Sequence, residues 1–553
     1  MITLLIVFLV LLISCFGNEV APEITISQGT LKGTTGKTIK GRTFLSFKGI
    51  PYAKPPIGDL RFKEPQPPEP WSGVLNASVN HAMCLQVNIF SLNTVATGDE
   101  NCLFLNVYTP SISKGQLLPV IVYIHGGGFV IGNANRYGPE KLLDNNLVFV
   151  TINYRLGALG FLSTEDDVVP GNNGLKDQNF ALKWIRDNIK HFGGNPEKIT
   201  ISGQSAGGAS VFFHMLSPLS KDLLHASISI SGISIGTWAL AQRGEPRRNL
   251  HKLAAILDCP IHSSKATVEC LKKIDGNTLI EQSVKFWEYN YDPCILFKPV
   301  VESPSETAFL TDTPLTLIKN GQFAHIPFMS SVTTEDGAFK VASLHKNLTL
   351  IERLNSEFNK LVRLLLNFEE LDLDFEAIAE TVKSYYFKDR YIDSTSKDLL
   401  IDLLTDVMFY VPQRLGSTLY AKYSKQPVYF YVFGYKGSYS YTKLYGDPTT
   451  DFGVAHCDDL LYLFESPDLN YKPTEADLKI TDLMTTLWYN FANTGNPNPT
   501  DSKSKWVPVS TDNLEYYFIK DSNDLTMSKN LYEERYQFWN NLHIFDRNVK
   551  DEL

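Results

Sequence analysis

The chain has 553 residues, of which 43% are hydrophobic and 20% are charged, and its formal net charge is −9 at neutral pH. This length allows a large buried core, and the mild acidity argues against a nucleic-acid partner. No Ser/Gly tract, proline run, charge block or internal repeat divides the sequence, so we expect one large domain with insertions.

The first residues form an apolar segment, Met1–Gly17, that is short for a membrane span and ends in small residues. We interpret it as a secretory signal peptide, followed by a single domain over residues 18–549. A retained membrane anchor is the alternative, because no basic side chain opens the segment. No other segment approaches membrane-spanning length, so stable membrane insertion is not expected.

A chain that enters the secretory pathway meets an oxidising environment in which disulfides are permitted. The six cysteines beyond the signal peptide are Cys84, Cys102, Cys259, Cys270, Cys294 and Cys457. The first two and the next two each close a short loop, and both pairs are predicted to be bridged. No spacing resembles a zinc site, and neither a metal nor a cofactor is expected. Sequons at Asn76 and Asn347 predict glycosylation on surface loops.

Short apolar runs rich in β-branched residues alternate with helical stretches through the middle of the chain, as is typical of buried parallel strands. The expected strands are Val120–Ile124, Leu147–Ile152, Ile199–Ser202, Ala226–Ser231, Pro327–Val332 and Val428–Phe433. A helix is expected over Leu175–Phe192, ended by Gly193-Gly194, and a helical, charged cap or insertion over residues 350–415. The pattern predicts an α/β fold with a large, mostly parallel sheet and helices on both faces.

The pentapeptide Gly203-Gln204-Ser205-Ala206-Gly207 follows an expected strand and precedes a helix-compatible segment. Strand, tight glycine turn and helix together form the context of a nucleophile elbow, with Ser205 at its apex. The backbone of such a turn is strained and crowded, so residues without a Cβ are needed on either side of the serine. This context predicts Ser205 as a catalytic nucleophile.

A glycine run, His125-Gly126-Gly127-Gly128-Phe129, follows the expected strand Val120–Ile124. Acyl transfer through a tetrahedral intermediate needs preorganised N–H donors for the oxyanion. Glycines allow backbone amides to approach a substrate oxygen, and such a run accompanies the nucleophile elbow in hydrolytic α/β folds. We predict that the N–H groups of Gly127, Gly128 and Ala206 form an oxyanion hole; a plain flexible loop is the alternative.

A serine nucleophile needs an acid and a histidine, and in this architecture they follow the serine in that order. After the expected strand Pro327–Val332, Glu335 and Asp336 stand side by side before a glycine. Because successive side chains leaving a strand point to opposite sides, only one of them can face the histidine. The other is expected to face solvent, and the residues alone leave the choice open.

Three histidines come after the candidate acids in the chain and are considered as the base: His345, His456 and His543. The first follows the candidate acids too closely to come from a separate loop, and the last lies in a helix-like terminal segment. His456 stands in a loop led by Gly453 and followed by an apolar stretch, so we predict it as the base.

The chain ends in Lys550-Asp551-Glu552-Leu553, the retrieval signal of the endoplasmic reticulum. Together with the signal peptide it predicts residence in the lumen of the endoplasmic reticulum and binding to a retrieval receptor. If the signal is not read, the protein is expected to be secreted.

The motifs described above resemble the type-B carboxylesterase and cholinesterase family, and the resemblance covers nearly the whole mature chain. Residues 192–207 are similar to the family's serine signature and residues 100–110 to its second signature, with Asn101 where an acidic residue or glycine is usual. Further matches are residues 47–53, 153–155 and 493–497. The resemblance implies the α/β-hydrolase fold, and both predicted disulfides match the first two of the family.

The resemblance also implies roles for individual residues. It places Ser205 as the nucleophile, His456 as the base and an acid directly before a glycine, which here is Asp336. The family usually has glutamate at that position, so this chain departs from the pattern, and Glu335 is the alternative acid one residue earlier.

Cholinesterases of this family carry a glutamate before the nucleophile and a tryptophan in the first disulfide loop. This chain has Gln204 and no tryptophan in that loop, so the features that hold a quaternary ammonium ion are missing. The resemblance therefore implies an enzyme most like the insect carboxylesterases, acting on small to medium apolar esters. A juvenile-hormone-type esterase, which shares Gln204 and the Gly453-x-x-His456-x-x-Asp459 pattern, and a non-catalytic cholinesterase-like binding protein are the alternatives. Trp238 either lines the acyl pocket or belongs to the ordinary core.

Overall fold

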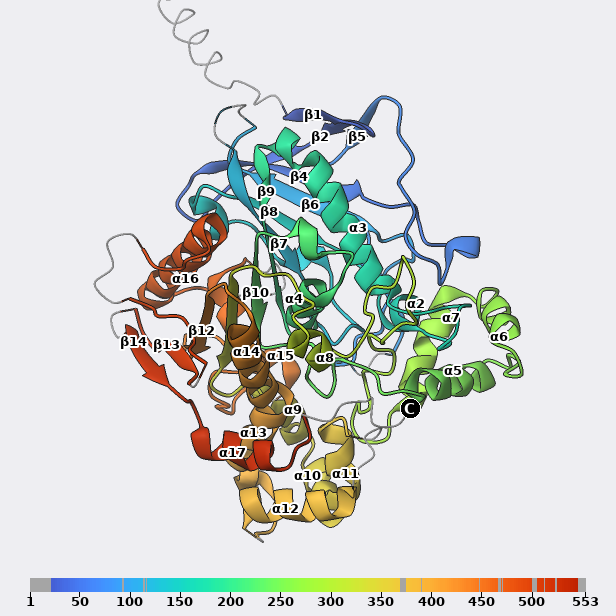
Figure 1. Cartoon of the computed structure of the whole chain (residues 1–553), viewed down its shortest axis with the longest axis vertical. Coiled ribbons are helices and arrows are strands. Elements are labelled where there is room, and N and C mark those ends of the chain that lie inside the picture. The colour runs from blue at the N-terminus through green and yellow to red at the C-terminus, as the bar shows by residue number, and fades with distance from the viewer. Residues whose placement is uncertain are drawn as a thin grey trace, which may run out of the picture.

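The computed structural model describes residues 21–545 except 92–93, 113–114, 116, 369–373, 389, 447, 466–468, 470, 500–504, 512 and 523–524. The expected signal peptide and the C-terminal tetrapeptide lie outside these residues. Figure 1 shows a large sheet through the middle of the molecule with helices on both sides, so the predicted fold class is confirmed.

The large sheet has eleven strands in the order β14-β13-β12-β11-β10-β9-β7-β8-β6-β4-β3. Strands from β13 to β8 pair in parallel, whereas the pairs at both edges are antiparallel. All six expected strands are present, although β9 is longer than expected. The strands are β3 (Thr34–Lys37), β4 (Thr43–Pro51), β6 (Phe104–Thr109), β7 (Leu118–Ile124), β8 (Val148–Ile152), β9 (Gly194–Gln204), β10 (Ala226–Ile230), β11 (Phe328–Thr333), β12 (Val428–Phe433), β13 (Glu515–Ile519) and β14 (Leu525–Lys529).

Alternation along the strands divides the interior into two cores. Val120, Val122 and Ile124 of β7 pack with α3 and α4 on one face, while Ile121 and Tyr123 pack with α16 on the other. Because both faces of the sheet are covered, the central strands are apolar throughout, which made them recognisable in the sequence. The helices that contact strands of the sheet are α3 (Asn173–Asn188), α4 (Ala206–Leu216), α14 (Val411–Tyr423) and α16 (Glu475–Thr494). Helices α2 (Gly157–Phe161), α8 (Pro314–Lys319) and α15 (Thr442–Tyr445) pack on other helices.

The helical insertion expected over residues 350–415 is present. Figure 1 shows α10, α11 and α12 gathered at one end of the molecule, opposite the small sheet of β1, β2 and β5. A π-helical turn, Asp406–Tyr410, joins α13 to α14. The remaining elements are β1 (Glu23–Ile26), β2 (Gly29–Lys32), β5 (Val74–Asn76), α5 (Glu245–Ile256), α6 (Ser264–Leu271), α7 (Gly276–Glu281), α9 (Ala338–His345), α10 (Leu348–Ser356), α11 (Phe358–Leu365), α12 (Phe375–Phe387), α13 (Lys397–Thr405) and α17 (Glu533–Asn541).

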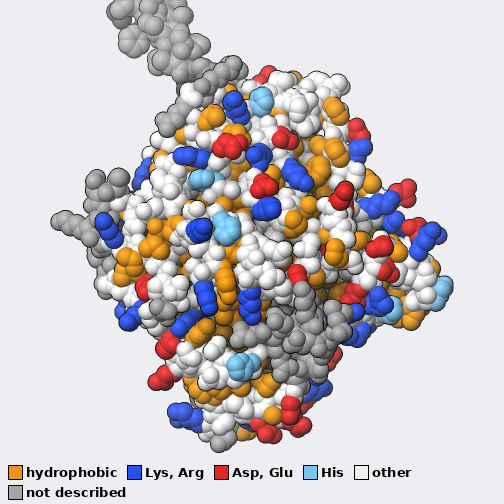
Figure 2. Space-filling view, viewed as in Figure 1, with side chains coloured by type: hydrophobic (Ala, Val, Ile, Leu, Met, Phe, Trp, Pro, Cys, Tyr) orange, Lys and Arg blue, Asp and Glu red, His pale blue; other side chains and the backbone are white. Residues whose placement is uncertain are grey.

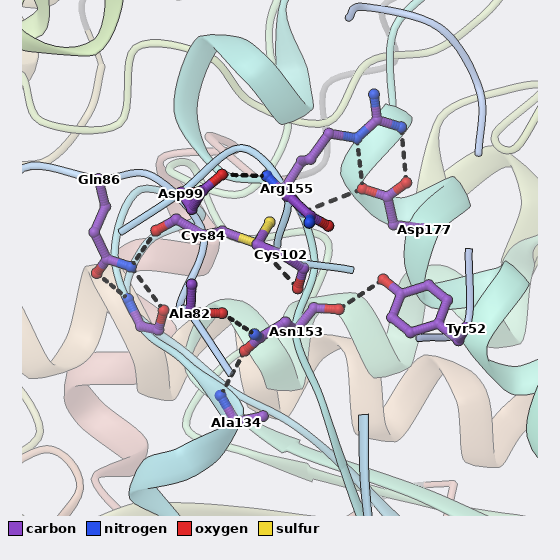
Figure 3. The surroundings of a disulfide bond; sticks show 12 residues. Tyr52, Ala82, Cys84, Gln86, Asp99, Cys102, Ala134, Asn153, Arg155 and Asp177 are labelled. Carbon is purple, nitrogen blue, oxygen red and sulfur yellow. Dashed lines mark hydrogen bonds and ion pairs between the residues drawn. A yellow bond between two sulfur atoms is a disulfide. The ribbon is translucent and has the colours of Figure 1, made fainter. Parts of the chain in front are cut away.

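The two disulfides predicted from the sequence, Cys84–Cys102 and Cys259–Cys270, are present, and the other two cysteines of the described residues are unpaired. Next to the first bridge, the amide of Gln86 forms two hydrogen bonds with Gly132 (Figure 3): it donates to the carbonyl at 2.9 Å and accepts from the N–H at 2.8 Å. These bonds join the first disulfide loop to the segment that follows the glycine run.

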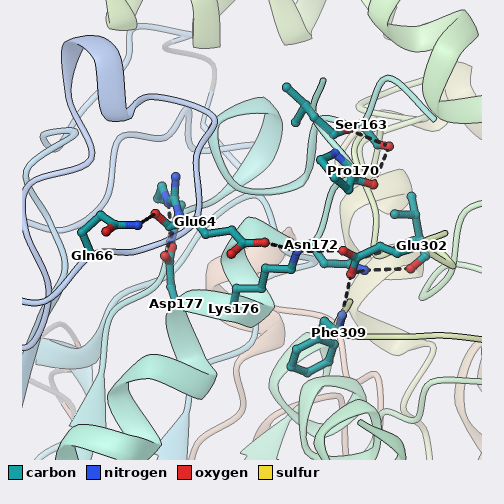
Figure 4. A network of polar contacts seen from close by, with 12 residues as sticks. Glu64, Gln66, Ser163, Pro170, Asn172, Lys176, Asp177, Glu302 and Phe309 are labelled. Carbon is teal, nitrogen blue, oxygen red and sulfur yellow. Dashed lines mark hydrogen bonds and ion pairs between the residues drawn. The ribbon is translucent and has the colours of Figure 1, made fainter. Parts of the chain in front are cut away.

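A buried ionic network ties α3 to two loops (Figure 4). Lys176 Nζ lies 2.8 Å from Glu64 Oε1 and 2.7 Å from Glu302 Oε2, and Asn172 donates a hydrogen bond to the same Glu302. Lys176 and Glu302 are almost inaccessible to solvent. Removing one partner would leave a buried charge uncompensated, at a cost of about 3–5 kcal/mol in folding free energy. The network therefore fixes the loops around α3.

On the face shown in Figure 2, acidic and basic side chains are interspersed, so the net negative charge does not gather there into one patch. Among the helices of the described residues, none is long and apolar enough to cross a membrane.

Candidate active site

The structure forms a sharp turn between β9 and α4, with Ser205 between them. Ser205 has φ 59° and ψ −123°, a strained backbone conformation for a residue with a side chain. Its N–H donates to Ile230 O at 2.8 Å, which anchors the turn to β10. A Cβ at Gly207 would lie 2.0 Å from Ile124 O, so only glycine allows α4 to pass this close to β7. The crossing leaves the Ser205 side chain partly exposed at the apex.

His456 and Asp336 come from two different loops and meet beside this turn. His456 Nδ1 lies 2.8 Å from Asp336 Oδ1, and the two side chains are 6% and 0% exposed. The second carboxylate oxygen accepts hydrogen bonds from Ser231 Oγ and from Thr333 N, both at 2.9 Å. Three donors on one buried carboxylate fix its orientation and satisfy its charge. The arrangement is that of an acid holding an imidazole.

The Gln204 side chain, which precedes the serine, contacts the same imidazole. Its Nε2 lies 2.9 Å from His456 Nε2 and 3.3 Å from Nδ1. The nearly equal distances place the amide against the ring between its two nitrogens, away from the direction of either lone pair. The Asp336 carboxylate can only accept, so the ring proton lies on Nδ1, facing Asp336. Within the described residues no hydrogen bond joins Ser205 Oγ to this ring; such bonds are often formed only in the complex with substrate.

Two aromatic rings cover the remaining sides of the imidazole. Phe409, from the π-helical turn, lies 4.4 Å from the His456 ring centroid, and Phe339 of α9 lies 5.2 Å from it. The sequence analysis did not identify these rings or the contact with Gln204, because they depend on how distant segments pack. The other two candidate histidines end α9 and follow α17, and the His345 ring packs edge-on against Phe452 with the ring centroids 5.6 Å apart.

Glu335 does not face the imidazole, and the expectation that it faces solvent is wrong. Its side chain is half-buried, and its Oε2 accepts hydrogen bonds from Val454 N at 2.7 Å and from Thr334 Oγ1 at 2.6 Å. Burial raises the pKa of this carboxyl group. The two neighbouring acids thus bond different parts of the loop that carries His456.

The glycine run lies against the serine. A Cβ at Gly126 would be 2.9 Å from Gln204 Oε1 and 3.0 Å from Ser205 Cβ. In the described part of the chain, the N–H groups of Gly127, Gly128 and Ala206 donate no hydrogen bond. Unpaired N–H groups beside a nucleophile can bind an oxyanion.

His125, at the start of the glycine run, has a structural role. Its ring stacks on Tyr154 at 4.4 Å, and the Tyr154 hydroxyl donates to His125 O at 2.9 Å. Burial lowers the pKa of His125 to about 4, so this imidazole is neutral at physiological pH.

A largely apolar pocket lies beside the glycine run, and Val130, which follows the run, is part of its lining. Gly128 lies against Ile295, and the two neighbours of Ile295 line the pocket. The lining comprises Leu85, Val87, Ile89, Val130, Gly157, Ala158, Leu253, Leu279, Ile280, Ser283, Trp287, Cys294, Leu296 and Phe297. Trp238 is not part of this lining: it is buried, it donates from Nε1 to Met408 O at 2.8 Å, and its ring lies near those of Phe129 and Phe409. Trp238 therefore belongs to the core.

Two buried carboxyl groups, those of Asp458 and Asp459, follow His456 closely in the chain. Asp458 accepts hydrogen bonds from Ala455 N at 2.8 Å and Tyr441 N at 2.7 Å, and Asp459 lies 3.4 Å from the Tyr431 hydroxyl. Burial raises the pKa of Asp458 to about 7 and that of Asp459 to about 8. No group of three or more metal-binding side chains occurs within the residues that the structure describes.

Both candidate glycosylation sites are accessible. The Asn76 and Asn347 side chains are exposed, and each accepts a 2.7 Å hydrogen bond from the hydroxyl of its own sequon, Ser78 or Thr349. Their modification stays a prediction.

Comparisons with known proteins identify a family and several similar chains. The chain matches the carboxylesterase family over residues 20–539. It is 37% identical over 526 residues to juvenile hormone esterase of Tribolium castaneum, covering 92% of this chain and 89% of that protein. It is 38% identical over 517 residues to esterase FE4 of Myzus persicae, covering 91% and 90%. The crystal structure of juvenile hormone esterase from Manduca sexta, with OTFP covalently attached, has a TM-score of 0.85 and 29% identity, covering 95% of this chain and 99% of that one.

Proposed function

The chain belongs to the carboxylesterase family and is an esterase, and from that premise we propose a serine mechanism centred on Ser205. The observation that supports it most is the pairing of His456 Nδ1 with Asp336 Oδ1 at 2.8 Å, beside a serine held in a strained elbow. In this proposal Ser205 is the nucleophile, His456 the base and Asp336 the orienting acid.

The proposed reaction proceeds through an acyl-enzyme. Ser205 Oγ attacks the ester carbonyl carbon, and its proton passes to His456 Nε2 while Asp336 stabilises the imidazolium. The tetrahedral oxyanion accepts hydrogen bonds from the N–H groups of Gly127, Gly128 and Ala206, each worth about 3 kcal/mol. The imidazolium gives its proton to the leaving alcohol as the C–O bond breaks. Water then repeats the sequence, releases the carboxylic acid and restores the serine.

We propose small to medium apolar esters as substrates. Gln204 is neutral where a cholinesterase carries a glutamate, and residues 84–102 contain no tryptophan. These two positions therefore lack the charge and the aromatic ring that would bind a cationic substrate. The pocket beside the glycine run is lined almost entirely by apolar side chains. Such a lining favours acyl or alcohol groups of the same character.

A juvenile-hormone-type esterase is the second candidate, favoured by two of the similar proteins that carry this name. The two candidates differ in the ester preferred. A general carboxylesterase should hydrolyse naphthyl and p-nitrophenyl acetates and butyrates best. A juvenile hormone esterase should instead prefer juvenile hormone by a large factor in kcat/KM.

The experiment is a panel of these esters with purified protein and with Ser205→Ala. The variant should lose hydrolysis by about 10⁶-fold without unfolding, since the nucleophile contributes to the transition state and little to packing. Hydrolysis by the variant at a tenth of the wild-type rate would refute the assignment of Ser205.

We also propose residence in the lumen of the endoplasmic reticulum, with a retrieval receptor as partner. The proposal is supported by the apolar segment Met1–Gly17 and by Lys550–Leu553. The paired cysteines suit such an oxidising compartment.

A further inference from the structure

We propose that Glu335 is a positioning residue that holds the backbone of residues 453–455 and thereby places the imidazole of His456. The inference rests on the proposed function, in which His456 is the base. It gives the two neighbouring acids separate tasks: Asp336 orients the ring, and Glu335 holds the loop from which the ring projects.

Glu335 and the loop are bonded reciprocally. Glu335 N donates to Val454 O at 3.1 Å, and Val454 N donates to Glu335 Oε2 at 2.7 Å. Glu335 also pairs with Ala455 as an isolated parallel bridge, one residue before His456. The acid loop and the base loop are therefore joined by main chain and side chain at once.

Three consecutive N–H groups of the base loop each donate to a carboxylate. Gly453 N donates to Asp451 Oδ1 at 3.0 Å, Val454 N donates to Glu335, and Ala455 N donates to Asp458 Oδ2 at 2.8 Å. The first and third acceptors belong to the base loop itself. Of these three acceptors, only Glu335 comes from another segment, the one that carries Asp336, so this bond joins the base loop to the acid loop.

Gly453 allows the contact. It has φ +81°, and a Cβ there would lie 2.7 Å from the carboxyl carbon and Oε2 of Glu335. Both the left-handed conformation and the close approach require glycine. The loop is thus shaped around the Glu335 carboxylate.

Glu335 is itself held in place. Its carbonyl oxygen accepts from Ala338 N at 2.9 Å at the start of α9, and Thr334 Oγ1 donates to the same Oε2 that binds Val454. Oε1 accepts no hydrogen bond among the described residues. Because a single oxygen receives both donors, a glutamine could present its own oxygen to them, whereas an alanine could not.

The test compares Glu335→Ala, Glu335→Gln and a matched control, Thr334→Val, which removes the other donor to Oε2 and leaves the loop contact. We expect kcat for a p-nitrophenyl ester to fall by about 10²-fold in Glu335→Ala with little change in KM, as for a base displaced by about 1 Å. Glu335→Gln should restore kcat to within tenfold of wild type, and Thr334→Val should stay within threefold. Each variant's melting temperature is measured in parallel.

Three outcomes would overturn the inference: Glu335→Ala within threefold of wild-type kcat, an equal loss in Glu335→Gln, or a loss confined to KM. If Glu335→Ala does not fold, Glu335→Asp replaces it; this variant withdraws the carboxylate by one methylene and should show the same loss of kcat. Organophosphate labelling of Ser205 in His456→Ala tests the proposed function separately. Labelling at the wild-type rate there refutes His456 as the base, whereas slow labelling beside a fully active Glu335→Ala refutes only the positioning role.

Discussion

Gln204 Nε2 lies 2.9 Å from His456 Nε2 and 3.3 Å from Nδ1, so the residue before the proposed nucleophile packs directly against the imidazole of the proposed base. The side chain at position 204 therefore contributes to the environment of the base as well as to the choice of substrate.

Replacing Gln204 with glutamate should move the acid limb of the kcat/KM profile to higher pH. A carboxylate about 3 Å from the imidazole stabilises the protonated ring. Since only the neutral ring acts as base, activity at pH 6 should fall more than activity at pH 8. Gln204→Met, similar in length and uncharged, should leave the limb in place, and equal profiles for all three proteins would contradict the prediction.

His456→Ala should lose esterase activity by about 10⁶-fold, because the nucleophile and its base act as one unit. The measurement is the rate at which an organophosphate labels Ser205, followed by mass spectrometry. Wild type should be labelled quickly and the variant barely at all. Equal rates would mean that another group serves as the base.

Asp336→Asn should reduce kcat by about 10⁴-fold, the loss found when the corresponding acid of a serine protease is neutralised. The asparagine favours the wrong tautomer of His456 and cannot stabilise the imidazolium. Asp336 is fully buried and accepts three hydrogen bonds, so the melting temperature should fall as well. Glu335→Gln is the matched control on the same ester and should lose less than tenfold. If Glu335→Gln lost several orders of magnitude in kcat while Asp336→Asn stayed active, the acid would be Glu335.

Asp459→Asn should flatten the pH dependence of stability. Burial raises the pKa of Asp459 to about 8 in the folded protein, against about 3.9 in an unfolded chain. The unfolded state therefore releases this proton first as pH rises, and the stability that the group contributes below pH 4 is lost progressively up to about pH 8. The difference in melting temperature between variant and wild type should grow in favour of the variant from pH 5 to pH 8. A constant difference across that range would contradict the assignment.

Deleting Lys550–Leu553 should release the enzyme into the culture medium, because the retrieval signal is an address read by a receptor and not an anchor. Esterase activity in medium and cells is the measurement, with Leu553→Val as a milder change at the same site. If the truncated protein stays with the cells as fully as the intact one, either the signal is not read or Met1–Gly17 is retained as an anchor.

The central strands could be predicted from the sequence because they are buried on both faces and therefore consist of continuous apolar runs, as in Val120–Ile124. The antiparallel strands at the edges of the sheet were not predicted. Strand β3, Thr34–Lys37, carries polar residues and a glycine and borders solvent on one side, so its composition resembles that of a loop. Its pairing with β4 depends on the register between the two strands, and tertiary packing sets that register.

The same division holds at the site. Ser205, the glycine run and the order of acid and histidine are local or topological signals, and they predicted which segments meet. The position of Glu335 was misjudged, because strand alternation states only that it points away from Asp336. What lies on that side is the backbone of Val454, 119 residues further along the chain. A contact of this kind follows from packing and leaves no local signal.

At Ser205, whose φ is positive, the conformational preference of the backbone conflicts with the need for a reactive side chain. Glycine would adopt this conformation more readily than serine does, so the fold on its own would favour glycine there. A lineage released from the need to hydrolyse esters would gain stability by that exchange and lose its catalyst in the same step. In the proposed mechanism the Ser205 hydroxyl is needed for turnover at a position where the backbone favours glycine.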